Sequence, residues 1–167
     1  MKRTAATVLL LLLLTVPTHA ATVESVKLPD GAYGVWYIHN LHVEATLYKS
    51  KANTLAENQK VVDLEDAALW WPYRHGHAIV DHLESQAGAG WWRVADIRVG
   101  DVGELTTEQG KAYFACVAVM LAEQVGNSYL STIDGRLVTC NKGDVLCVSC
   151  ADEGGRMVYA AYFKALG

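Results

Sequence analysis

Residues 144–164 read DVLCVSCADEGGRMVYAAYFK and contain an apolar run, a tight turn and a second apolar run. The first run has the composition of a β-strand and ends at Cys150. Residues 151–155 (ADEGG) are typical of a turn, and Arg156 opens the second strand, which continues to Lys164. Because strands joined by a short turn pair antiparallel, we expect Cys150 and Arg156 to lie at the same rim of a sheet.

Further runs rich in β-branched and aromatic residues are bounded by Gly, Asn or Asp. They predict strands at residues 33–39, 42–48, 78–81, 102–107 and 111–121, besides the two at 144–150 and 156–164. With seven or eight short strands and neither heptads nor repeats, the fold class expected is all-β, as a single barrel or sandwich.

One or two short helices complete this picture. Residues 50–60 are polar and are expected to form a loop, after which Asp63 can cap a short helix that Pro72 ends. The apolar face of this helix would carry Leu64, Ala67, Ala68 and Trp71.

The composition narrows the class of protein. Of the 167 residues, 51% are hydrophobic and 19% are charged, which excludes a disordered chain and suits one domain with a core. The formal net charge of -4, without a cluster of Lys and Arg, argues against nucleic-acid binding.

The first residues have the pattern of an export signal. Lys2 and Arg3 precede an apolar run over residues 5–16, and Ala20 suits cleavage by a signal peptidase. We therefore expect a signal peptide at residues 1–20, an exported domain at residues 21–167, and an extracellular or cell-surface location. An uncleaved N-terminal anchor, giving peripheral membrane association, is the alternative.

Four cysteines lie in the last third of the chain: Cys116, Cys140, Cys147 and Cys150. In an exported chain an even count permits two disulfides. Cys147 and Cys150 also form a Cys-x-x-Cys pair, but a redox motif needs a helix N-terminus, and here the pair lies in a predicted strand.

Three histidines and an aspartate lie close together in HGHAIVDH, residues 75–82. A zinc site on His75, His77 and His82 is one interpretation, although the run is two residues longer than the His-x-His-x-Asp-His pattern. Solvated loop histidines are the simpler interpretation for His75 and His77. We expect no metal and no cofactor.

Cys150, Arg156 and His82 together have the chemistry of acyl transfer. A thiol nucleophile needs a neighbouring base or cation, and the tetrahedral intermediate needs a donor for its oxyanion. His82, at the end of a predicted strand, would be the acid and base, Cys150 the nucleophile and Arg156 the oxyanion donor.

The order His, Cys, Arg on a small exported β-barrel resembles the sortase family of cysteine transpeptidases from Gram-positive bacteria. AIVDH (residues 78–82) resembles the family's I-x-G-H strand, and LCVSC (146–150) followed by RMVY (156–159) resembles its T-L-x-T-C and R-x-V-V strands. Residues 35–48 resemble its N-terminal hairpin and residues 91–101 its F-x-x-L-x-x-L-x-x-G-D segment. The sequence departs from these motifs at Asp81, Cys147 and Ser149.

The resemblance implies a closed sortase-like β-barrel and a defined reaction. Cys150 would attack a peptide carbonyl in the sorting signal of a surface protein and form a thioacyl-enzyme. His82 would protonate the leaving amine and then deprotonate an incoming amine acceptor, and Arg156 would hold the oxyanion. We expect a monomer. A non-catalytic binding module on the same barrel is the alternative function.

Several alternatives stay open. RLVTC, residues 136–140, also resembles T-L-x-T-C, but with Cys140 as nucleophile the apolar run 144–150 would have to be a loop, so we prefer Cys150. A Cys116–Cys140 disulfide with Cys147 unpaired is then one arrangement.

Asp81 either contacts the histidine or faces outward, and strand alternation favours the outward direction. The tryptophan pairs at 70–71 and 91–92 suit packing, and loop 84–90 is a candidate gate.

Overall fold

The computed structural model describes residues 27–51, 55–64, 66–81, 94–152 and 154–167. The predicted signal peptide, His82, the loop 84–90 and the pair Trp91–Trp92 lie outside these residues. Among the helices of the described residues, none combines the length and the apolar character needed to span a membrane.

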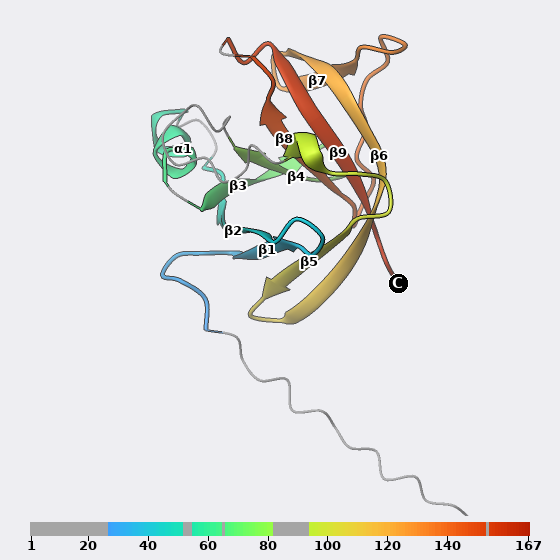
Figure 1. Cartoon of the computed structure of the whole chain (residues 1–167). Coiled ribbons are helices and arrows are strands. Elements are labelled where there is room, and N and C mark those ends of the chain that lie inside the picture. Colours follow the sequence, from blue (N-terminus) through green and yellow to red (C-terminus); the bar gives the residue numbers. More distant parts are fainter. Residues whose placement is uncertain (1–26, 52–54, 65, 82–93, 153) are drawn as a thin grey trace, which may run out of the picture.

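Strands dominate the described residues (Figure 1). A 3-10 turn at residues 94–96 accompanies one α-helix. The elements in chain order are β1 (Gly34–Ile38), β2 (Val43–Lys49), α1 (Leu55–Val62), β3 (Ala67–Tyr73), β4 (Gly76–Asp81), β5 (Val102–Thr107), β6 (Gly110–Val125), β7 (Ser128–Ser131), β8 (Val145–Cys150) and β9 (Met157–Ala165).

The sheet closes into a barrel. Its order is β5-β1-β2-β3-β4-β8-β9-β6-β7, and an additional β5–β6 pairing joins the two sides. Eight strands therefore form a ring, and β7 is attached outside it through β6. This confirms the predicted closed β-barrel, because a ring leaves no unpaired edge among its members.

Two parallel pairings set the position of the site. β2 pairs in parallel with β3 across α1, and β4 pairs in parallel with β8. In the second pair Asp81 lies opposite Ser149, at the last paired position. β8 and β9 form the predicted antiparallel hairpin, with Cys150 opposite Val158.

The prediction of a helix after Asp63 is wrong. Ala67–Tyr73 is strand β3, and the helix lies earlier, at Leu55–Val62, where a polar loop was expected. β3 is hydrogen-bonded on both sides, by β2 and by β4, and its first four residues are buried. A strand in the middle of a sheet can be apolar on both faces, so its sequence does not show the alternation that identifies a half-exposed strand.

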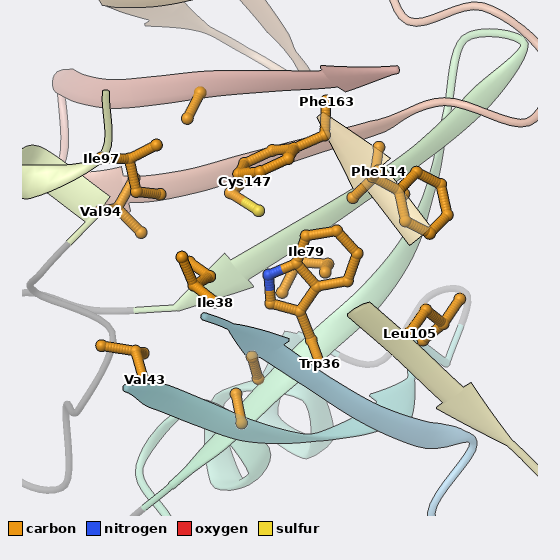
Figure 2. Packing of buried hydrophobic residues seen from close by; sticks show 14 of the residues in the cluster. Trp36, Ile38, Val43, Ile79, Val94, Ile97, Leu105, Phe114, Cys147 and Phe163 are labelled. Atoms are coloured by element: carbon orange, nitrogen blue, oxygen red, sulfur yellow. The ribbon is translucent and has the colours of Figure 1, made fainter. Parts of the chain in front are cut away.

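The barrel interior is packed around Trp36 (Figure 2). Its ring lies 5.3 Å from the rings of Phe114 and Phe163. Ile79 and Cys147, from the parallel pair β4–β8, belong to the same buried cluster. The site-bearing strands are thus fixed from the inside of the barrel.

A second buried cluster lies on the other face of these strands. It includes Leu146 and Val148, which alternate with the interior residue Cys147, and it is covered by the chain between β7 and β8. Tyr73 donates a hydrogen bond to the Val138 carbonyl (2.7 Å), and the His75 N–H donates to the Cys140 carbonyl (3.2 Å). These bonds hold the covering segment against the β3–β4 turn.

Candidate active site

Cys150 is the last residue of β8 and is half-buried. It lines a cavity of about 250 Å³. The apolar part of the cavity wall is formed by Leu69, Trp71, Ala78, Val80, Val148 and Val158. Asn58 and Gln59 of α1 lie on one side, and Asn127 and Tyr129 contribute from the β6–β7 hairpin. A thiol at the end of a strand thus borders a largely apolar hollow that is large enough for a side chain.

The surroundings of Cys150 keep its thiol protonated. Burial raises the pKa of the thiol above its usual value, and the negative charges of Asp152 and Asp81 raise it further. Thiolate nucleophiles are usually favoured by nearby cations or a base. Cys150 therefore needs a base, or a change in its surroundings, to become the attacking species.

The hairpin turn after Cys150 is organised by Asp152. Its carboxylate accepts hydrogen bonds from the N–H groups of Arg156 (2.9 Å) and Met157 (3.3 Å). The turn brings Gly155 back to the thiol, since a β-carbon built on this glycine would lie 3.8 Å from Cys150 Sγ. The backbone directly before Arg156 thus lies beside the sulfur.

The Arg156 side chain is exposed and has a partner of its own. Its Nε and Nη2 donate hydrogen bonds of 3.0 and 2.8 Å to Oε1 of Glu123 on β6. The resting structure therefore holds the guanidinium in an ion pair on the surface. Sequence reasoning did not identify Glu123, because the β6–β9 pairing that brings it there is not local in sequence.

The expectation that Asp81 faces outward is wrong. Asp81 is 3% exposed and borders the same cavity as Cys150. Simple alternation misplaces it because both faces of β4 are covered, one by the barrel interior and one by the second cluster. His82, the predicted acid and base, lies outside the described residues.

The other three cysteines differ from Cys150. Cys116, Cys140 and Cys147 are buried, and all four thiols are unpaired, so neither two disulfides nor a Cys116–Cys140 bridge is formed. Cys116 and Cys140 belong to clusters on opposite faces of the sheet, which explains why they do not pair. Burial raises the pKa of Cys140 to about 11, and its Sγ lies 3.5 Å from the His77 carbonyl oxygen. Cys140 is therefore the poorer candidate nucleophile.

The histidine cluster is divided between two environments. His75 is exposed in the β3–β4 turn, as expected, whereas His77 is half-buried in β4 and stacks on Trp70 with 4.4 Å between ring centroids. Burial lowers the pKa of His77, which favours its neutral form. The described residues contain no group of three side chains arranged to hold a metal ion.

Several sortases of known structure have a similar barrel. A lid mutant of Streptococcus agalactiae sortase C1 matches with a TM-score of 0.60 and 9% identity, over 84% of this chain and 72% of its own. The Clostridium perfringens sortase D5 transpeptidase matches with a TM-score of 0.56 and 14% identity, over 84% and 83%. Listeria monocytogenes sortase A matches with a TM-score of 0.57 and 9% identity, over 83% and 89%. The chain has the sortase fold.

The likeness to sortases is one of structure. No family model and no curated protein matches the sequence. Within this sortase fold, the β8–β9 hairpin brings together the sulfur of Cys150 and the backbone preceding Arg156.

Proposed function

We propose that this protein is a sortase-like cysteine transpeptidase with Cys150 as its nucleophile. The observation that carries the proposal is the unpaired, half-buried Cys150 thiol, which lines a cavity in a sortase fold while the three other thiols are buried. The proposed substrate is a peptide sorting signal of a surface protein, and the acceptor is an amine.

His82 is proposed as the acid and base of this reaction. It follows Asp81 in sequence as Cys150 follows Ser149, and Asp81 and Ser149 are register partners in the parallel pair β4–β8. Ala78, Val80 and Asp81 of the strand that precedes His82 line the cavity. A base is needed because burial and acidic neighbours keep the Cys150 thiol protonated.

The reaction then proceeds in two transfers. Cys150 Sγ attacks the peptide carbonyl carbon after its proton passes to His82, and the C–N bond breaks as His82 protonates the leaving amine. The incoming amine attacks the thioester, gives its proton to His82 and releases the thiol. Arg156 is proposed to exchange Glu123 for the oxyanion, and exposed ion pairs of this kind contribute little to stability.

Export is proposed with this function. A chain that acts on surface proteins must reach them, and the leader-like residues 1–20 supply a route, either as a cleaved signal peptide or as an anchor. Residues 21–167 would then form the exported domain.

The test is formation of a thioacyl adduct. Wild-type protein is incubated with a pool of sorting-signal peptides, and its intact mass is measured before and after hydroxylamine, which cleaves thioesters. We expect one adduct that hydroxylamine removes and that is missing in C150A and H82A, while C140S, the control at a buried thiol, retains it. R156K should form it at least about tenfold more slowly, because Lys lacks the planar fork of Arg. An adduct on C150A would overturn the proposal, and a stable fold that forms no adduct would favour the non-catalytic binding module.

A further inference from the structure

Tyr129 of β7 lies over the same cavity as Cys150. It is 8% exposed and its ring lies 5.3 Å from the ring of Tyr73 on β3. The strands β4, β8, β9 and β6 separate β3 from β7 in the sheet order, so this contact joins two elements that are not neighbours in the sheet. Tyr129 thus belongs to the part of the cavity wall that the β6–β7 hairpin supplies.

The two tyrosine hydroxyls have different surroundings. Tyr73 Oη donates to the Val138 carbonyl and accepts a bond from the Tyr129 N–H (3.4 Å). The Tyr129 hydroxyl, by contrast, makes no hydrogen bond within the part of the chain that the structure describes, and it is not one of the buried side-chain atoms that lack a partner. The hydroxyl is therefore accessible, and because Tyr129 lines the cavity, it can donate a hydrogen bond to a molecule bound there.

Electrostatics keep this hydroxyl a donor. Burial raises the pKa of Tyr129, and the neighbouring Tyr73 and Cys150 raise it further. The Tyr129 hydroxyl therefore stays protonated at neutral and mildly alkaline pH. Cys150 and Tyr129 line the same cavity.

We propose that the Tyr129 hydroxyl donates a hydrogen bond to the acyl oxygen of the substrate when Cys150 attacks, and so is a catalytic residue of the proposed transpeptidase. As the C–S bond forms, the carbonyl π electrons move onto the oxygen, where the phenol stabilises them. When the intermediate collapses, those electrons re-form the C=O bond and the leaving group departs. Tyr129 keeps its proton throughout. The inference rests on the proposed function, because it supplies a donor to that reaction.

The test compares two reactions of the same sulfur. Acylation by p-nitrophenyl acetate forms an oxyanion and releases p-nitrophenolate, whereas alkylation by iodoacetamide displaces iodide and forms no oxyanion. We expect Y129F to slow the Cys150-dependent burst of p-nitrophenolate by about tenfold to a hundredfold. The rate of alkylation should stay within about twofold of wild type. C150A supplies the background rate.

The matched control is Y73F. Its lost hydroxyl bonds the protein backbone, so we expect lower thermal stability and an unchanged ratio of acylation to alkylation. If Y129F slows both reactions equally, Tyr129 acts on the thiol and the inference fails. If it slows neither, the inference also fails, although the burst in wild type would still support the proposed function. If wild type gives no burst while iodoacetamide labels Cys150, both proposals fall.

Discussion

The Cys150 thiol lies between an apolar wall and two acidic side chains. Burial, Asp152 and Asp81 all raise its pKa, so the thiolate fraction near neutral pH is small and grows as the pH rises. We expect the rate of alkylation by iodoacetamide to keep increasing above about pH 8.5, where an ordinary cysteine is already half-ionised. Rates measured between about pH 6 and 10 check this.

D152N isolates the contribution of one charge. The amide oxygen of Asn can still accept the hydrogen bonds from Arg156 and Met157, so the turn is preserved while the negative charge is lost. The pKa of Cys150 falls and alkylation near pH 7 becomes about two to five times faster. D134N is the control, because Asp134 accepts a similar bond from the Arg136 N–H in another turn. No acceleration in D152N would contradict this assignment.

At the residue scale, local sequence was informative for some site residues and not for others. The β8–β9 hairpin that carries Cys150 and leads to Arg156 could be predicted because one short turn joins its strands. Glu123 and Tyr129 could not be predicted, since Glu123 reaches Arg156 through the β6–β9 pairing and Tyr129 contacts Tyr73 of the distant strand β3. No local pattern encodes such long-range contacts.

At the element scale, the strands that alternate or carry turn signals were predicted well. β5 has the predicted bounds, and β1, β2, β8 and β9 differ from theirs by one or two residues. β3 failed because its residues Ala67, Ala68 and Trp71 also satisfy helical spacing, and Pro72 imitates a helix stop. Only its pairing with β2 and β4 shows that this segment is a strand and not a helix.

The β1–β5 pair depends on a close approach at Gly103. Ile38 lies opposite Gly103, and a β-carbon at this position would overlap the Trp36 ring at the centre of the core. Because that ring is fixed by Phe114 and Phe163, it cannot move aside. We expect G103A to lower the free energy of unfolding by about 1–3 kcal/mol, measured by urea denaturation.

G154A is the control for this substitution. Gly154 has open space where a β-carbon would lie, so the same chemical change should leave the free energy of unfolding within about 0.5 kcal/mol of wild type. Equal stability of the two variants would show that Trp36 does not require a glycine opposite it.

At the scale of the whole molecule, the fold leaves one thiol, Cys150, partly accessible to solvent and buries the other three. Native protein treated with a maleimide should therefore gain one label quickly, at Cys150, and four only after unfolding in denaturant. Since no disulfide is present, a reducing agent should not change the melting temperature. Intact-mass spectrometry gives the count, and fewer than four labels without reductant in denaturant would show that a bridge exists.

β9, which follows the other described strands of the ring in the sequence, lies between β8 and β6 and completes the ring. During synthesis, β6 and β8 each present an unpaired edge until the ribosome has added residues 157–165. A growing chain therefore cannot close its barrel before β9 is made, and the rim that holds Cys150 gains its neighbour Val158 only with that strand.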